Sequence, residues 1–228
     1  MPNELLWIIF LLIDLSFTVL LFRFFGKKGL YAIISANIIL CNIQVTKLVN
    51  LFGMTVTLGN ILYGSIFLAT DLLSEFYGKK EAQKAVNMGF IYVIFMTFVL
   101  QFSILFNPAP DDMVQDAMKT IFGFIPRIAL GSIIAYLISQ THDVWAFHFW
   151  KTKTKDRKLW IRNNASTMVS QAIDSLFFCF IAFWGIYPKT VFLQILITTY
   201  VMKLVVAVMD TPFIYLAKKW SKPILSSE

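Results

Sequence analysis

The chain has little of what a soluble enzyme or a secreted domain requires. It contains two cysteines, Cys41 and Cys179, which both lie in apolar runs and lack metal-ligand spacing, so no disulfide framework and no thiolate metal site are indicated. A Gly-rich phosphate loop, GxSxG and HExxH are all missing, and we expect a protein that is not an enzyme and holds no cofactor. Only 14% of its 228 residues are charged, which leaves nothing for a second, aqueous domain.

The chain does have a large excess of apolar residues. They make up 58% of the sequence, 23 of them are Phe, and the mean hydropathy is +0.70. Apolar runs of a length that spans the hydrocarbon core of a bilayer are separated by short charged clusters. We therefore predict an all-α, polytopic membrane bundle in which residues 1–228 form a single domain. The predicted spans are 5–25, 30–50, 56–77, 86–106, 125–149, 164–185 and 190–217.

The net charge of +7 does not indicate a nucleic-acid partner, because Lys and Arg lie mainly in short segments between the spans. Basic clusters follow the first, third, fifth and last spans. The loops on the other side hold only Lys119 and Lys189, beside Asp111, Asp112 and Asp116. The positive-inside rule then predicts an N-terminus outside and a cytoplasmic C-terminus. The first span lacks a basic leader and a cleavage site, so we expect a retained helix.

The segment 159–178 carries polar groups along one helical face. Asn164, Thr167, Gln171 and Asp174 are spaced by three, four and three residues, while the opposite face is apolar. A carboxylate this deep in a spanning helix costs several kcal/mol unless it faces protein or water. Asp174 lies about ten residues from the cytoplasmic boundary, which places it near the bilayer midplane, where transporters commonly bind their substrates.

Other charges also lie within the spans, and two interpretations of them remain open. They are three bases and three acids: Lys47, Arg127, Lys203, Asp143, Asp174 and Asp210. They could form structural ion pairs that fix helix packing. Because the bundle carries more charge than packing needs, we favour a solvated substrate path.

Asp71 and Glu75 lie one turn apart near the cytoplasmic end of the third span. They could bind a proton or cation as a pair, but their place near the boundary favours a gate or an anchor to a base such as Lys79. His142 and His148 lack the spacing of paired metal ligands, and we expect no metal site. The predicted gate or structural charge network comprises Asp71, Glu75, Arg127, Gln140, Asp143, Arg162, Asn163, Asn164 and Asp210.

Several long motifs resemble those of the queuosine precursor transporter family, also called the vitamin uptake transporter family. They are LCNIQVTKLV at 40–49, FLATDLLSEFYGKKEAQKAV at 67–86, SQTHDVWAFH at 139–148, LWIRNNASTMVSQAIDS at 159–175 and DTPFIYL at 210–216. The resemblance runs from about residue 30 to residue 216. The family's usual core has six helices, which implies a core over 30–217 and makes 5–25 an additional, accessory first helix.

The resemblance implies a bacterial inner-membrane protein that imports 7-deazaguanines such as preQ0 or preQ1 for transfer-RNA modification. Such a base presents two adjacent donors that one carboxylate can accept together, and its carbonyl needs a donor. Aromatic side chains would stack on its ring, although the sequence singles out none of them. The predicted substrate-binding residues are Asn42, Lys47, Gln171, Asp174 and Lys203.

Three functional hypotheses follow, and the expected partners are a deazaguanine base and the lipid bilayer. The first is a self-sufficient carrier, either a monomer or a homodimer. The second is a substrate-capture subunit that depends on a separate ATPase module, since the chain has no nucleotide-binding motif of its own. The third, disfavoured by the missing enzyme motifs, is an intramembrane enzyme.

Overall fold

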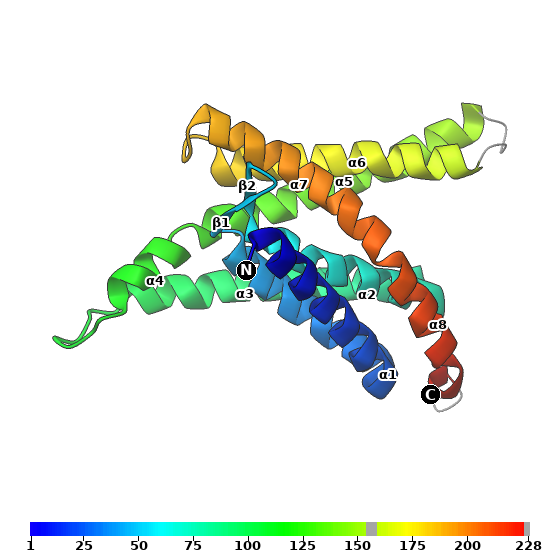
Figure 1. The fold of residues 1–228 in the computed structure, drawn as a ribbon, viewed down its shortest axis with the longest axis horizontal. Helices are drawn as coiled ribbons and strands as arrows, with labels where there is room; N and C mark the ends of the chain where they lie inside the picture. Colours follow the sequence, from blue (N-terminus) through cyan, green and yellow to red (C-terminus); the bar gives the residue numbers. More distant parts are fainter. Residues whose placement is uncertain (154–158, 226–228) are drawn as a thin grey trace.

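The protein is a bundle of long helices with one small β-hairpin, seen in a computed structural model (Figure 1). The structure describes the backbone of residues 1–153 and 159–225; the side chains at 143–144, 147–148, 150–153, 159–167 and 221–225 lie outside the described part. The elements are α1 (Asn3–Gln44), β1 (Leu48–Leu51), β2 (Met54–Thr57), the 3-10 turn η1 (Leu58–Asn60), α2 (Leu62–Tyr77), α3 (Lys79–Leu105), α4 (Gln115–Phe122), α5 (Ile125–Lys153), α6 (Leu159–Phe183), α7 (Lys189–Met209) and α8 (Thr211–Leu225).

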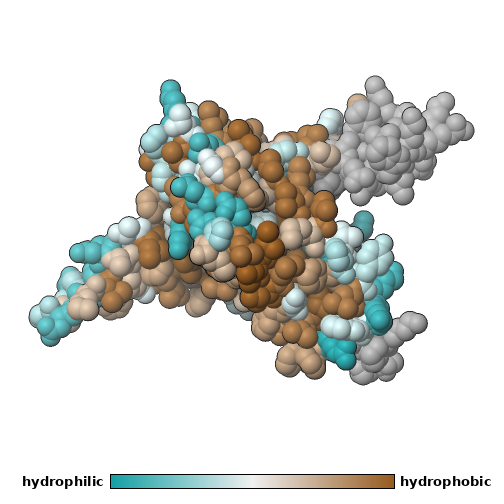
Figure 2. Space-filling view, viewed as in Figure 1, coloured by the Kyte–Doolittle hydropathy of each residue, from teal (hydrophilic) through white to brown (hydrophobic). Residues whose placement is uncertain are grey.

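The surface and the length of the helices are those of a membrane protein. Within the described residues, four stretches are long and apolar enough to cross a bilayer: Asn3–Gln44, Lys79–Leu105, Gln115–His142 and Lys189–Trp220. The helix Met168–Phe183 is apolar but shorter. Hydrophobic residues cover much of the helix flanks, and hydrophilic residues gather near the loop before α4 and near α8 (Figure 2). The predicted all-α membrane bundle is thus confirmed.

Helix α1 folds back on itself at Gly26, where φ is 54° and ψ is −134°. Its two arms, 3–25 and 27–44, lie side by side (Figure 1). The first arm buries Leu11, Leu15 and Phe22 completely in the same apolar core as α2. The arm that we expected to be an accessory addition therefore supplies part of the bundle's core.

The β-hairpin replaces the helix that we predicted at the end of the second span and the start of the third. Its strands pair antiparallel, and its turn residues Phe52 and Gly53 both have positive φ, the geometry of a tight hairpin turn. The strand segments carry the β-branched residues Val49, Thr55 and Val56, which favour an extended chain. The spans predicted at 30–50 and 56–77 are consequently shorter, because α1 ends at Gln44 and α2 begins at Leu62.

Hydrogen bonds join the hairpin to α7 and to the N-terminal residues of α1. The backbone N–H of Thr55 donates to Gln194 Oε1 of α7 at 3.0 Å. The N-terminal residues hold the turn, because Asn3 Nδ2 donates to the Asn50 carbonyl at 3.0 Å and Glu4 Oε1 accepts from the Phe52 N–H at 2.9 Å. The hairpin therefore fixes α1 and α7 at a common end.

The reversal at Gly26 generates the first prediction. An alanine there must adopt a backbone conformation that L residues rarely occupy, so Gly26→Ala should lower the free energy of unfolding by about 1–3 kcal/mol. Thermal unfolding of the purified variant in detergent would measure the loss. Gly131→Ala is the matched control, because a Cβ there meets only ordinary contacts of 3.4 Å or more. Equal melting temperatures for Gly26→Ala and the parent would contradict the prediction.

Candidate functional site

A cavity of about 470 Å³ lies between α1, α2, α3, α5, α6 and α7. This volume is typical of small-molecule sites. Its walls combine apolar rings with a few converging polar groups, the composition expected when a flat polar ligand must be both enclosed and oriented. The cavity is therefore the candidate site.

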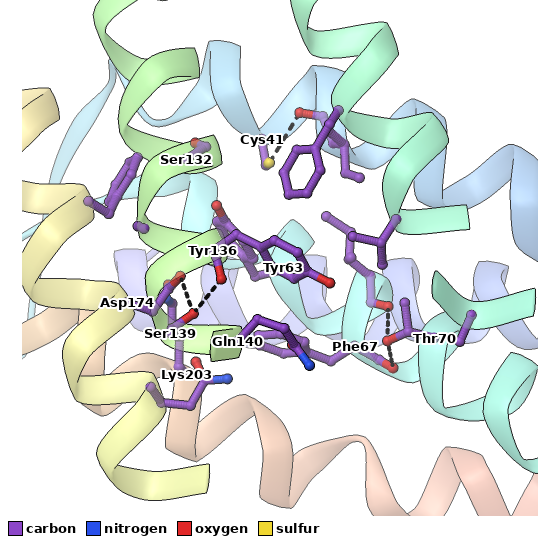
Figure 3. A pocket seen from close by; sticks show the side chains of 18 of the residues that line it. Cys41, Tyr63, Phe67, Thr70, Ser132, Tyr136, Ser139, Gln140, Asp174 and Lys203 are labelled. Carbon is purple, nitrogen blue, oxygen red and sulfur yellow. Dashed lines mark hydrogen bonds and ion pairs between the residues drawn. The ribbon is translucent and has the colours of Figure 1, made fainter. Parts of the chain in front are cut away.

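The charged centre of the cavity is an ion pair between Asp174 of α6 and Lys203 of α7 (Figure 3). The Lys203 side chain is only 4% exposed, whereas that of Asp174 remains 20% exposed. Ser139 on α5 also donates to Asp174 Oδ1, at 3.4 Å. The lysine thus neutralises the carboxylate while the acid keeps access to the cavity.

Lys203 also links α7 to α2. Its Nζ lies 5.4 Å from the ring centroid of Tyr63, a distance at which an ammonium is attracted to the face of an aromatic ring. Phe67 lies one turn along α2, with its ring centroid 6.1 Å from that of Tyr63. The rings of Phe90 of α3 and Tyr136 of α5 also line the cavity and meet edge to face at 4.8 Å. The structure therefore brings aromatic rings from three helices to the cavity.

The amide side chains of the cavity differ in how many of their hydrogen-bonding atoms already have a partner. Asn42 Nδ2 donates to the Ile38 carbonyl at 2.7 Å, and Asn42 Oδ1 accepts from Ser132 Oγ at 3.1 Å. Gln171 Oε1, in contrast, is buried and has no partner among the residues that the structure describes. Because a buried unpaired oxygen is costly, Gln171 is the amide best placed to gain from a ligand.

Four of the five predicted substrate-binding residues line the cavity: Asn42, Gln171, Asp174 and Lys203. Lys47 does not. It is exposed in the turn between α1 and β1, and the reason is the β-hairpin, which ends the helix before this residue. The expectation that Lys47 supplies a donor from within a span is wrong.

The members of the predicted charge network lie in different places. Asp71 and Gln140 line the cavity, whereas Glu75 pairs with Lys218 of α8 at 3.0 Å on the surface. Asp210 is buried at the junction of α7 and α8, and its carbonyl accepts the first backbone bonds of α8. The side chains of Asp143, Arg162, Asn163 and Asn164 lie outside the described part.

Arg127 lies in the first turn of α5, away from the ion pair of Asp174 and Lys203, and has a structural role. Its guanidinium donates to the carbonyls of Ile181 and Trp184, at the end of α6. These carbonyls lack partners within the helix, and a cation there also interacts favourably with the helix dipole. Arg127 therefore caps α6.

Sequence reasoning overlooked the polar stripe of α5. Ser132, Tyr136 and Ser139 follow each other by four and three residues and all line the cavity. The helical spacing itself was a sufficient signal. We overlooked it because serine and tyrosine are common in membrane helices and carry no charge.

The comparisons with known proteins agree with this architecture. The family model described as "Putative vitamin uptake transporter" matches residues 57–217. A "Probable queuosine precursor transporter" of Bacillus subtilis (strain 168) is 47% identical over 220 residues, which cover 96% of each chain. The "Queuosine precursor transporter" of Escherichia coli (strain K12) is 30% identical over 143 residues, 63% of this chain and 62% of its own.

No solved structure matches the chain. The family model covers more than half of the sequence and includes five of the six helices around the cavity completely. The relative from Bacillus extends the similarity to nearly the full length. The chain therefore belongs to the vitamin uptake transporter family.

Proposed function

We propose that this protein imports queuosine precursors, 7-deazaguanine bases, across the bacterial inner (plasma) membrane. The observation that carries the proposal is the accessible carboxylate of Asp174 at the centre of a ring-lined cavity. The names of the relatives from Bacillus and Escherichia supply the substrate class. No catalytic step is part of the proposal.

A single carboxylate can hold the base and its lysine together. The deazaguanine offers N1–H and an exocyclic amine side by side, and a carboxylate has about four acceptor positions. Asp174 can therefore accept both donors while its other lone pairs stay with Lys203 and Ser139. The amide of Gln171 then serves the polar edge of the base, since Asn42 is already committed to Ile38 and Ser132.

The aromatic walls enclose the faces of the base. Tyr63, Phe90 and Tyr136 are at the cavity surface. Stacked or edge-to-face contacts of such rings add about 0.5–1.5 kcal/mol each beyond the area that they bury. At the cytoplasmic end, the pair of Glu75 with Lys218 ties α2 to α8, and we assign it to the gate rather than to ligand contact.

The first prediction from this proposal concerns Asp174. Replacing it with Asn turns one acceptor into a donor that faces the donors of the base, so affinity should fall by about 2 kcal/mol, or about thirtyfold. Calorimetry or ligand-dependent thermal shift with preQ0 and preQ1 would measure the change. Asp111→Asn, in an exposed loop, is the control and should bind as the parent does.

The loss of Asp174 also leaves Lys203 buried without its partner, which is destabilising in itself. The double variant Asp174→Asn/Lys203→Met removes both charges and is measured in parallel on monodisperse protein. If either variant binds the preferred base within about threefold of the parent, Asp174 is a packing residue and does not anchor the substrate.

The orientation is also a proposal, with the N-terminus outside and the C-terminus in the cytoplasm. The bend of α1 and the ends of α5 and α8 point toward one side of the molecule, and α4 and the hairpin toward the other (Figure 1). The bend carries Lys27 and Lys28, and the loop before α4 carries Asp111 and Asp112. The positive-inside rule assigns the basic side to the cytoplasm.

Cysteine labelling in intact cells tests this orientation in a background without Cys41 and Cys179. An impermeant maleimide should label Asp112→Cys and leave Lys28→Cys unlabelled until the cells are opened. Both positions are exposed in the folded protein, so access depends on the side of the membrane. The reverse pattern would overturn the topology.

We further propose that the protein works without an energising ATPase, as a monomer or a homodimer. Purified protein in liposomes should then take up labelled base faster than protein-free liposomes do. Product analysis by mass spectrometry should return the base unchanged. Uptake that requires a second, ATP-hydrolysing component would favour the substrate-capture hypothesis, and a modified product would favour an enzyme.

A further inference from the structure

Another aspartate, Asp14, lies inside the bundle but outside the cavity. Asp14, in the first arm of α1, is only 6% exposed, and its Oδ1 accepts from Asn37 Nδ2 of the second arm at 2.9 Å. The same Nδ2 also contacts Ser65 Oγ of α2. Asp14 Oδ2 is buried and has no hydrogen-bond partner within the described part of the chain. One acidic oxygen is thus left over in a closely packed, three-way helix contact.

No cation compensates Asp14 among the described residues. Cys41 of the second arm interacts electrostatically with Asp14 and with Lys203 of α7, and Lys203 pairs with Asp174 instead.

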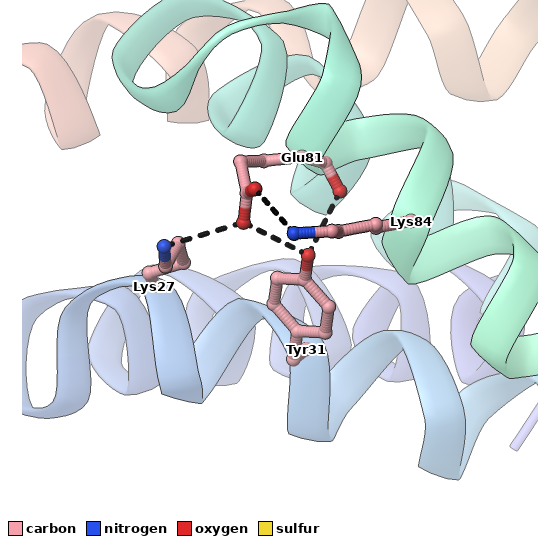
Figure 4. Close-up of polar contacts among 4 residues, drawn as sticks. All are labelled: Lys27, Tyr31, Glu81 and Lys84. Atoms are coloured by element: carbon pink, nitrogen blue, oxygen red, sulfur yellow. Dashed lines mark hydrogen bonds and ion pairs between the residues drawn. The ribbon is translucent and has the colours of Figure 1, made fainter.

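The charges on the other helices packed against α1 bond to one another at its bend. Glu81 of α3 accepts from Lys27 at 3.2 Å, from Lys84 at 3.1 Å and from Tyr31 at 3.0 Å (Figure 4). Lys218 of α8 forms an ion pair with Glu75 of α2, with 3.0 Å between Nζ and Oε1. None of the ion pairs among the described residues includes Asp14.

Asp14 and Asp174 therefore differ in what stabilises them. Asp174 has Lys203, which stabilises its carboxylate. Asp14 has one amide donor and a dry, apolar setting, in which an isolated carboxylate costs several kcal/mol and the neutral acid is the favoured form. When two acids in one protein have such opposite environments, they are suited to opposite roles.

We infer that Asp14 is the proton-binding residue that couples base import to the proton gradient. The acid accepts a proton from outside water when the three-helix contact opens, carries it as the neutral carboxyl group while the contact is closed, and releases it to cytoplasmic water. The O–H bond that forms on one side of the membrane breaks on the other. No further reactant is needed.

The contacts of Asp14 connect it mechanically to the substrate cavity. Its partner Asn37 is one residue before Ile38 and one turn before Cys41, and both of these line the cavity. Ser65 lies between Tyr63 and Ile66 of α2, which also line it. An ionised Asp14 requires water, so loss of the proton separates α1 from α2 and changes the shape of the cavity wall.

The test uses purified protein in liposomes and labelled preQ1 or preQ0, and its readout rests on the proposed import activity. An inward-directed proton gradient should accelerate net uptake by the parent at least tenfold, and a dye trapped inside should report acidification that depends on the base. Asp14→Asn keeps the shape and a hydrogen bond but cannot carry the proton. It should lose the acceleration while it binds the base within about threefold and still exchanges labelled for unlabelled base without a gradient. Asp111→Asn should behave as the parent.

The outcomes separate the two proposals. If the parent binds neither base, the proposed function fails. If the parent imports base but a proton gradient neither accelerates uptake nor acidifies the interior, the coupling inference is overturned and the function stands. Accumulation by Asp14→Asn at the parent's rate would also overturn it. Should that variant fail to fold, the acidification assay on the parent decides alone.

Discussion

The ion pair between Asp174 and Lys203 is the interaction on which the rest of the interior depends. A lone charge of either sign at this depth would cost several kcal/mol, and removal of one partner from a buried pair typically costs about 3–5 kcal/mol. The pair joins α6 to α7, while Lys203 also faces Tyr63 of α2 and Ser139 of α5 donates to the acid. Four helices therefore meet at one neutralised carboxylate, and the cavity is the space that this arrangement leaves beside it.

Much of the site could be predicted because the bilayer makes buried charge informative. Asp174 and Lys203 are 29 residues apart in sequence, yet each was recognisable alone, since neither is tolerated against lipid. Their distance, and the fact that they neutralise each other, depend on how α6 packs against α7, which no local pattern encodes. The same holds for the rings of Phe90 and Tyr136: aromatic residues are so abundant here that only packing distinguishes those at the cavity from those that face outward, such as Phe95.

The fold was less predictable where local chemistry competed with hydropathy. Residues 48–57 are apolar enough to extend a span, but β-branched residues and a Phe-Gly turn favour a hairpin, and this removed Lys47 from the helix. The surroundings of Asp14 were hard to predict for a different reason. Among the described residues, its carboxylate bonds to no side chain of its own arm of α1, and its partner Asn37 comes from the arm on the far side of Gly26. When each span is considered alone, Asp14 therefore looks isolated. The reversal of α1 at Gly26 brings the side chains of Asp14 and Asn37 together.

The hairpin also gives α7 a fixed end. Gln194 and Thr198 of α7 bond to the backbone of Thr55, so the helix is held at its N-terminal half, while Asp210 breaks it from α8 at the other end. Lys203 lies nine residues beyond Gln194, roughly 13 Å along the axis by helical rise. A swing of roughly 10° about that anchor would displace its ammonium by roughly 2 Å, a distance sufficient to break a hydrogen bond. The anchor of α7 thus lies at the hairpin, and a small tilt of the helix there would be enough to break or form the contact between Lys203 and Asp174.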